Sequence, residues 1–232
     1  MAEIIWKNKS NKEITGLIIT DMPPITKPKM KVNKVEIDGR DGDVIENLGY
    51  ESYTKNIGVG LTKNFDIDEV MKYFTGSGEL VLSDEPNKVY VANIYDDIDY
   101  EKLLLMRKAT IKFQVQPYKY LKDESKVILN IDTETSVDVI NQGLEIAKPI
   151  FKIYGTGKVE LAINGVNTFQ YEFPDNEEYA IINSLDEEAY YGSEYRNRKM
   201  VGEFPKLDPG TSTISWTGSL TKIEIEPKSR WL

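Results

Sequence analysis

The stretch FKIYGTGKVELAINGVNTFQYEF, residues 151–173, indicates the fold class more clearly than any other part of the chain. Apolar and polar residues alternate along it, and the alternating apolar residues are Val159, Leu161, Ile163, Phe169, Tyr171 and Phe173. Alternation with a period of two places the apolar side chains on one face of a sheet. Asn164-Gly165 lies between the two runs, and these residue types best tolerate the positive φ angles of a type I′ turn. The stretch therefore predicts a β-hairpin.

Similar alternation occurs elsewhere, so strands are expected along most of the chain. Phe151 and Ile153 alternate at the start of the stretch quoted above, and the clearest runs outside it contain Ile57, Val59 and Leu61; Ile111, Phe113 and Val115; Ile214 and Trp216; and Ile223 and Ile225. Near the start, Val35 and Ile37 also alternate with polar residues and lead into a turn-rich cluster at 38–42. We expect the apolar side chains of all these runs to face the buried side of a sheet.

One segment shows a helical pattern instead. The four apolar residues spaced at i, i+3, i+4 and i+7 are Ile67, Val70, Met71 and Phe74. They share one face of a helix, which Asp66 or Asp68 is suited to cap and Gly76 to end. So short a helix is not stable alone and must pack on a sheet. A weaker helical pattern covers residues 186–191.

The composition limits the chemistry that the chain can perform. The 232 residues include no cysteine and no histidine. Disulfides, thiolate zinc sites and histidine-based triads are therefore excluded. An enzyme built from this chain would have to use carboxylates, lysine or tyrosine, which lowers the expectation of catalysis. The net charge of −9 disfavours ordinary binding to a phosphate backbone.

No targeting or membrane segment is expected. No apolar run approaches the roughly 20 residues that a membrane helix needs. Glu3, Lys7 and Lys9 interrupt the N-terminal stretch, which therefore lacks the apolar core of a signal peptide.

Several residue patterns resemble known sites but match them incompletely. The glycine pairs 58/60, 76/78 and 155/157 lack the third glycine of a dinucleotide fingerprint, and turns or bulges explain them. Asp97 and Asp99 supply only part of a calcium loop. Adjacent acids in a strand point to opposite sides, so the clusters at 84–85 and 186–188 do not indicate a glycosidase pair. We expect no catalytic residue, no cofactor and no metal site.

Aromatic residues in the second half of the chain leave two interpretations open. Tyr190, Tyr191 and Trp216, with Tyr195 near them in the sequence, are the residues concerned. Exposed rings on a β-sandwich can stack on a sugar. Alternatively, these rings fill the core or a subunit interface, where Tyr and Trp are common.

A series of short motifs resembles one family, the distal tail proteins of long-tailed, non-contractile phages of Gram-positive bacteria. The motifs, in chain order, are Ile37–Gly42, Gly49-Tyr50, Tyr73–Gly76, Gly78–Pro86, Phe113–Tyr118, Asn141–Gly143, Pro149, Gly155–Gly157, Phe204–Gly210 and Pro227–Trp231. No single motif is specific, but the ordered series covers nearly the whole chain. Asn141-Gln142-Gly143 departs from the expected Asn-Gly-Thr type, which affects one turn.

The resemblance implies a mainly β protein with two domains. Residues 1–132 would form a β-rich, sandwich-like ring (belt) domain with one α-helix. Residues 133–232 would form a β-sandwich similar to galectins and carbohydrate-binding modules. Whether the last strand returns to the first domain stays open.

The resemblance also implies a structural role in the virion. Six copies would form a ring at the tail tip that stacks on the tail tube protein and holds the tail-associated fibre or lysin protein. Receptor-binding or baseplate proteins would be further partners. Whether the chain comes from a phage, a prophage or a tail-like bacteriocin stays open. DNA would pass through the lumen without specific binding. Pro24, Pro28, Arg40 and Asp41 are the candidate contacts with a neighbouring copy or partner.

Two other functions remain as alternatives. A carbohydrate-binding module of a phage or cell-surface protein would use Tyr190, Tyr191 and Trp216 for stacking. A carboxylate-dependent glycosidase would need two buried acids in a cleft, and the sequence offers no such pair.

Overall fold

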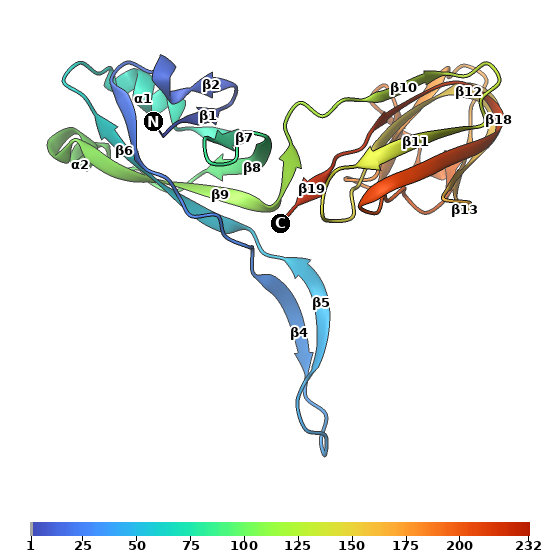
Figure 1. The fold of residues 1–232 in the computed structure, drawn as a ribbon, viewed down its shortest axis with the longest axis horizontal. Helices are drawn as coiled ribbons and strands as arrows, with labels where there is room; N and C mark the ends of the chain where they lie inside the picture. Colours follow the sequence, from blue (N-terminus) through green and yellow to red (C-terminus); the bar gives the residue numbers. More distant parts are fainter. Residues whose placement is uncertain (1) are drawn as a thin grey trace. The chain divides into compact units, whose positions relative to one another are not determined.

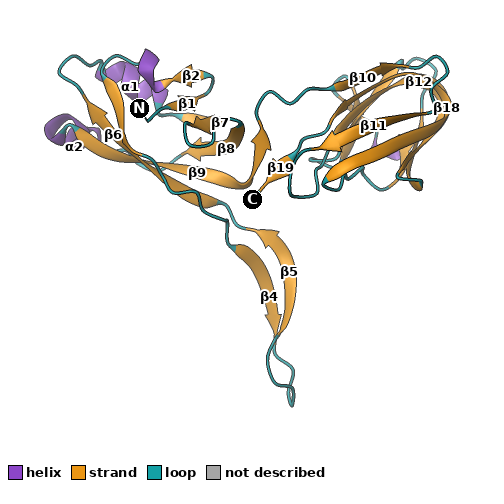
Figure 2. Ribbon diagram, in the orientation of Figure 1, coloured by secondary structure: helices purple, strands orange, loops and turns teal. Residues whose placement is uncertain are grey.

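Strands make up most of the chain in the computed structural model, which describes residues 2–232 (Figure 1, Figure 2). The chain divides into two compact units: one extends to Lys122 and includes the C-terminal Leu232, and the other is Asp123–Trp231. Each unit has its own hydrophobic core. The strands form two major sheets, one of which curls into a half-barrel, and a separate two-stranded ribbon. The prediction of a mainly β protein is confirmed.

The sheet of the first unit is antiparallel. Its strands are β1 (Ile4–Trp6), β2 (Lys9–Ser10), β3 (Leu17–Asp21), β6 (Tyr53–Leu61), β7 (Gly76–Leu82), β8 (Lys88–Ile94) and β9 (Lys108–Leu121). They pair in the order β2-β1-β7-β8-β9-β6-β3, and a 3-10 helix, Asn11–Glu13, follows β2. The β6–β9 ladder runs from the pair Tyr53–Val115 to the pair Gly60–Lys108.

The apolar faces of β6 and β9 form the centre of the first core. Ile57, Val59, Ile111, Phe113 and Val115 are all fully buried, as the alternation predicts. The ring of Phe113 packs edge-on against that of Trp6, with centroids 5.2 Å apart. Fully burying a side chain of this size contributes about 1.5–3 kcal/mol relative to leaving it exposed.

The predicted helix is present as α1 (Ile67–Tyr73). Asp66 caps it, because its carboxylate accepts hydrogen bonds from the backbone N–H groups of Asp68 and Glu69. The prediction that Gly76 ends the helix is wrong: α1 ends at Tyr73 with Phe74 as its C-cap, and Gly76 is the first residue of β7.

The expectation of a single helix is also wrong, because a second helix, α2 (Tyr100–Met106), precedes β9. Its carboxylate cap is Asp99, which accepts a 2.8 Å hydrogen bond from the N–H of Lys102. Only Leu103 of α2 is buried. The weaker helical prediction at 186–191 is wrong as well. Those residues form a turn and strand β15 (Glu188–Tyr191), where buried Ala189 pairs with a neighbouring strand.

The second unit contains the other major sheet. Its strands are β10 (Val127–Asn130), β11 (Ser136–Asn141), β12 (Ile150–Ile163), β13 (Val166–Glu172), β14 (Tyr179–Asn183), β15, β16 (Glu194–Tyr195), β17 (Met200–Gly202) and β18 (Gly210–Glu226). The main path is β10-β18-β12-β14-β15-β16; β11 pairs with β18, β13 with β12, and β17 with β13. A 3-10 helix (Asn197–Lys199) and the short β19 (Arg230–Trp231) complete the chain.

Two long strands, β12 and β18, pair along most of their length and hold the second unit together. Their register shifts around Gly155. Bulges therefore account for the glycine pair 155/157. Gly218 has φ +93°, and a Cβ there would lie 2.4 Å from the carbonyl oxygen of Lys158. The hairpin predicted at Asn164-Gly165 is confirmed: both residues have positive φ between β12 and β13.

The ribbon consists of β4 (Met30–Val35) and β5 (Val44–Tyr50), which pair with each other and with no other strand in residues 2–232. The compact units divide after Lys122. The boundary of the functional domains, placed between residues 132 and 133 by sequence, stays a prediction. Within residues 2–232, no helix is long and apolar enough to span a bilayer.

Candidate functional site

The β4–β5 ribbon is the most unusual surface of the first unit. Figure 1 shows it leaving the sheet to which β6 belongs. Every residue of β4 is exposed. Six of the ribbon's exposed residues are large and apolar: Met30, Val32, Val35, Ile37, Ile45 and Leu48, with exposures between 38% and 60%. An isolated two-stranded hairpin is at best marginally stable in water, so this surface is suited to being covered by another molecule.

The prediction that Val35 and Ile37 face a buried side of a sheet is wrong. Val35 is the last residue of β4 and is 46% exposed, and Ile37 lies beyond the strand and is 48% exposed. Alternation identifies which side chains share a face. Burial of that face requires a second layer, and within the described residues the ribbon has none.

The tip of the ribbon, residues 36–43, holds two of the predicted contact residues. Arg40 and Asp41 lie between Gly39 and Gly42, whose φ angles are +80° and +78°. The N–H of Arg40 donates a 3.1 Å hydrogen bond to the carbonyl of Ile37, which closes a turn. Both side chains are exposed and form no ion pair with the described residues, so they are available to a partner.

The segment that leads into the ribbon is fixed to its own unit. Pro23 and Pro28 are buried, whereas Pro24 is exposed. The carbonyl oxygen of Pro24 accepts a 3.1 Å hydrogen bond from Nζ of Lys55 on β6. The two predicted contact prolines therefore differ: Pro24 is open to a partner, and Pro28 packs inward.

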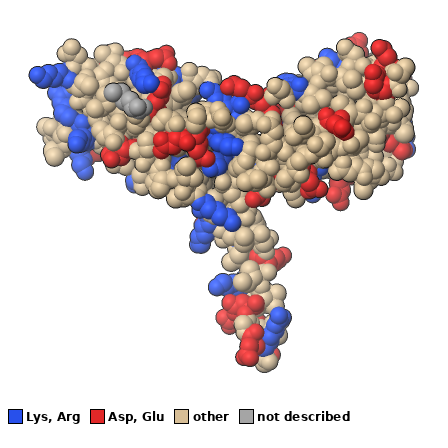
Figure 3. Space-filling model, viewed as in Figure 1, with Lys and Arg blue, Asp and Glu red and all other residues tan. Residues whose placement is uncertain are grey.

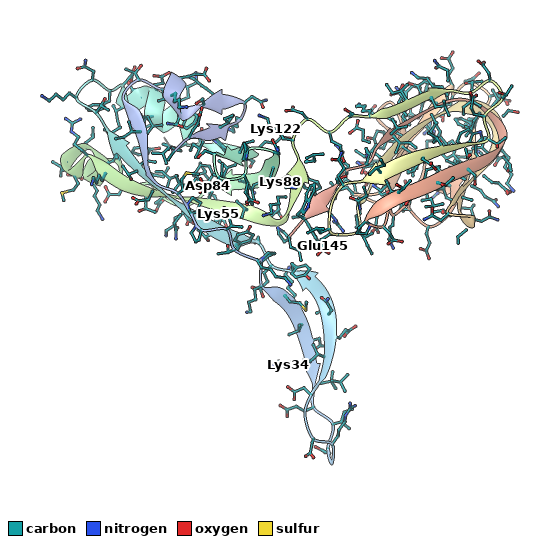
Figure 4. All side chains as sticks on the ribbon, viewed as in Figure 1. Lys34, Lys55, Asp84, Lys88, Lys122 and Glu145 are labelled. Carbon is teal, nitrogen blue, oxygen red and sulfur yellow. The ribbon has the colours of Figure 1, made fainter. Side chains whose placement is uncertain are left out.

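Lys55 is a buried cation at the base of the ribbon and is labelled in Figure 4. It is 2% exposed, and its ammonium lies 4.8 Å from the centroid of the Tyr90 ring and 5.6 Å from that of Tyr53. Burial lowers the pKa of Lys55, and the nearby Glu85 opposes that change. Burial also raises the pKa of Tyr53 to about 12.

Glu85 joins this base to β9. Its carboxylate accepts a hydrogen bond at 2.6 Å from Nζ of Lys119, which is buried, and another from the hydroxyl of Tyr90. Burial acts to raise the pKa of Glu85, but the hydrogen bonds from Lys119 and Tyr90 and the charges of Lys119 and Lys55 together lower that pKa below its ordinary value. Glu85 therefore stays ionised between two lysines.

Aromatic contacts also hold the end of β5 at the base of the ribbon. The ring of Tyr50, at the end of β5, packs edge-on against Tyr118 of β9 with centroids 6.0 Å apart. The N–H of Glu51 donates a 2.8 Å hydrogen bond to the carbonyl of Lys29. The exposed ribbon is thus carried on a well-packed base, which is the arrangement expected of a positioned contact arm.

The sequence contains a signal for this base outside the motifs described above. Lys55 has the same parity as Ile57 and Val59, and Lys119 has the same parity as Phe113 and Val115. Period two therefore places both lysines on buried faces. Their joint partner Glu85 lies in the turn between β7 and β8, which no local pattern connects to them.

The aromatic candidates of the second unit are not gathered on one open surface. Trp216 is 7% exposed and belongs to the second core. The rings of Tyr191 and Tyr179 have centroids 4.7 Å apart. Tyr190 is half-buried and pairs across the strands with Tyr195, which is 70% exposed. Sugar stacking by these residues stays a prediction.

Tyr195 lies at a hollow of about 480 Å³, whose other lining residues are Pro174, Glu177, Arg196, Asn197, Arg198 and Lys199. Arg196 is held there by the chain's own acids, Glu177 at 2.5 Å and Glu194 at 2.7 Å. Burial is the main cause that raises the pKa of Tyr171 to about 12, and the charge of Glu177 acts in the same direction.

The acidic clusters have structural partners. Asp99 caps α2, Asp96 pairs with Lys112 at 3.7 Å, and Asp186 accepts a 2.7 Å hydrogen bond from Asn183. Among residues 2–232, no group of three or more acidic side chains is placed to hold a metal ion.

Comparison with known proteins identifies the fold. No protein-family model matches the sequence, and no curated protein matches it significantly. The fold is that of a phage tail hub protein. The Dit protein of phage SPP1, described as a paradigm of the hub adsorption apparatus in phages that infect Gram-positive bacteria, matches over 100% of both chains, with a TM-score of 0.72 and 15% identity.

Two structures of the phage p2 baseplate in its activated conformation, one with strontium and one with calcium, match over 97% of each chain at 10% identity, with TM-scores of 0.47 and 0.48. The full-length match to the SPP1 protein confirms, at the level of the fold, the resemblance to distal tail proteins.

Proposed function

We propose that this chain is a structural protein of a phage tail tip, whose copies form a hexameric ring between the tail tube and the adsorption apparatus. The observation that carries the proposal is the full-length match in fold to the SPP1 hub protein. The motif series of the sequence supports it independently, because it runs through both units in the family's order.

The exposed ribbon supports assembly of this kind. A closed ring of identical chains needs a heterologous interface, in which one patch meets a different patch on the next copy. The ribbon offers apolar side chains and two unpaired strand edges, and such edges readily accept a partner. In this proposal, Pro24, Arg40 and Asp41 contact a neighbouring copy or partner. Pro28, buried in its own unit, holds the ribbon in position.

The two halves of the chain would have different roles. Residues 1–132 would build the ring, and residues 133–232 would form a galectin-like or carbohydrate-binding-module-like sandwich that projects outward. The last strand of the chain would return to the ring domain. The ring would stack on the tail tube protein and hold the tail-associated fibre or lysin protein, with receptor-binding or baseplate proteins as further partners, in the virion.

Charge is consistent with passage of DNA through such a ring. Each copy carries a net charge of −9, and an acidic lumen would repel the phosphate backbone rather than bind it. A map of the assembled ring with a neutral or basic lumen would contradict this part of the proposal. We propose no catalytic role and no cofactor.

A carbohydrate-binding module is the second candidate, because Tyr195 is exposed at a hollow that also contains Arg and Asn side chains. Glycan-array binding by the full chain, lost on Tyr195→Ala, would favour it. No binding to Gram-positive cell-wall polysaccharide would leave the structural role as the better account.

Negative-stain electron microscopy of the purified chain tests the structural role. We expect six-fold rings with an open centre, formed alone or on addition of the tail tube protein. A monomer at every concentration, with or without that protein, would contradict it.

A further inference from the structure

A second exposed apolar surface lies on α2. A surface helix normally buries one apolar stripe. In α2 the buried residue of that stripe is Leu103, which is 0% exposed. The next three residues, Leu104, Leu105 and Met106, are 39%, 75% and 68% exposed. We call these three residues the α2 patch. Three adjacent exposed apolar side chains on one short helix have no role in the core of their own unit.

Basic residues surround the α2 patch. Lys63, Lys102, Arg107 and Lys108 are exposed, and none of them forms an ion pair within residues 2–232. The guanidinium of Arg107 lies 4.4 Å from the centroid of the Phe65 ring, and its carbonyl accepts a hydrogen bond from Leu61. These contacts place the loop that carries Lys63 beside the end of α2. Figure 3 shows Lys and Arg side chains gathered over this end of the first unit.

The acids of this region lie mainly before the helix or at its start. Asp99 caps α2, and Asp96 pairs with Lys112, so two of them have partners within the chain. The C-terminal end of α2 therefore combines apolar side chains with Arg107 and Lys108, which form no ion pair within residues 2–232.

The ribbon tip has the opposite character. Residues 36–43 contain four acids, Glu36, Asp38, Asp41 and Asp43, against a single Arg40. Val35, Ile37 and Ile45 are exposed within or beside this acidic loop. The tip thus combines apolar side chains with a surplus of negative charge, and it complements the α2 patch in both respects.

The two surfaces are attached to opposite ends of one ladder. The ribbon enters β6 at Tyr53, which pairs with Val115, whereas α2 enters β9 at Lys108, which pairs with Gly60. At about 3.4 Å per residue, these ends are roughly 24 Å apart. Complementary patches at opposite ends of one body are what a head-to-tail interface requires.

We propose that the α2 patch of one copy is the acceptor for the ribbon tip of the next copy. This inference rests on the proposed ring. Apolar side chains of the tip would cover Leu104, Leu105 and Met106, and the acidic loop would face Lys102 and Lys108. Tip against tip would bring like charges together, which selects against a two-fold dimer through the ribbons.

Cross-linking tests the pairing directly, because the natural chain has no cysteine. Asp41→Cys and Lys102→Cys change exposed side chains on the two surfaces. Each variant alone should give no cross-link with a short bismaleimide. The mixture should give covalent dimers, and a chain with both changes should give a ladder up to six. Val166→Cys, 69% exposed on the second unit, combined with Asp41→Cys is the matched control and should give no ladder.

Charge reversal gives a second and independent readout. Lys102→Glu with Lys108→Glu, or Asp38→Lys with Asp41→Lys, should each raise the concentration at which half of the chains are in rings by about tenfold or more. Combining all four changes should restore ring formation. The inference would be overturned if the tip changes weaken ring formation, the α2 changes do not, and the combination of all four changes fails to restore it. That result would leave the proposed function intact.

Other outcomes distinguish whether a neighbouring copy or the tail tube protein occupies the α2 patch. If the α2 changes abolish binding to the tail tube protein but leave the ring unchanged, the tube occupies the patch and the inference fails. A wild-type chain that never forms rings, with or without the tube protein, overturns the proposed function as well.

Discussion

The β4–β5 ribbon leads directly into β6, the first strand of the β6–β9 ladder, and both pairs are antiparallel with alternating apolar residues. In the ladder, Ile57 and Ile111 face each other and are fully buried. In the ribbon, Val32 and Ile45 are exposed. The difference is the second layer: other strands and α1 cover the ladder, and none of the described residues of the first unit forms a layer over the ribbon. Strand pairing and burial are thus separate properties, and paired but uncovered strands indicate an assembly surface.

The largest effect should come from truncating the ladder core. Phe113→Ala removes a fully buried ring that contacts Trp6 and Phe74 and should lower the free energy of unfolding by about 3–5 kcal/mol. Urea denaturation followed by circular dichroism measures it. The matched change on the ribbon, Val32→Ala, should cost less than about 0.5 kcal/mol. Equal losses of unfolding free energy in the two variants would contradict the comparison between the buried ladder and the exposed ribbon.

The two buried lysines at the base of the ribbon, Lys119 and Lys55, should affect the free energy of unfolding differently. Lys119→Met leaves the carboxylate of Glu85 without its 2.6 Å partner and should cost about 3 kcal/mol. Lys55→Met removes a charge that burial disfavours and should leave the free energy of unfolding within about 1 kcal/mol of wild type.

Because Lys55 also holds the carbonyl of Pro24, its loss should act mainly on the ribbon. Amide hydrogen exchange at residues 22–29 should be faster in Lys55→Met than in wild type. Unchanged exchange there would mean that the hydrogen bond does not fix the ribbon.

The same base predicts a dependence on pH. The pKa of Glu85 lies below its ordinary value of 4.5, so its ionised form stabilises the folded state above that pH. This stability is lost as the pH falls through the lower pKa of the folded state. Urea midpoints measured from neutral to acidic pH should fall more steeply for wild type than for Glu85→Gln. Glu203→Gln, at an exposed acid, should follow wild type; a parallel shift of both variants would contradict the assignment.

The smallest effect on stability should come from the ribbon, together with a clear effect on assembly. Ile45→Ser changes a side chain that is 60% exposed and should alter the free energy of unfolding by less than about 0.5 kcal/mol. Ring formation should weaken by about tenfold, measured by sedimentation velocity. Val166→Ser, at a side chain that is 69% exposed on the second unit, should change neither quantity. An Ile45→Ser chain that unfolds, or that assembles like wild type, would show that the ribbon is not an uncovered interface.

The sequence predicts those features that local patterns determine. Alternation identifies the buried faces of β6, β9 and β12, the Asn164-Gly165 pair identifies the turn, and the spacing from Ile67 to Phe74 identifies α1. The helix α2 is not predictable in this way, because three adjacent apolar residues at its end obscure the helical period. The exposure of Val35 and Ile37 depends on a missing second layer, which no local pattern records.

The candidate site was predicted only in part. The cluster at 38–42 correctly marks a turn, and Arg40 and Asp41 lie at its exposed tip. Pro28, expected at a contact, is buried instead. The base depends on Lys55, Glu85 and Lys119, which tertiary structure alone brings together.

The mass of the purified chain in solution, with and without the ribbon tip, tests the central claim most directly. Replacing residues 36–43 with an Asn-Gly turn should preserve the folded chain, because those residues form no part of either core. Light scattering should give six times 26.5 kDa for wild type and the single-chain mass for the shortened variant. A shortened chain that still assembles into sixfold rings would contradict the account.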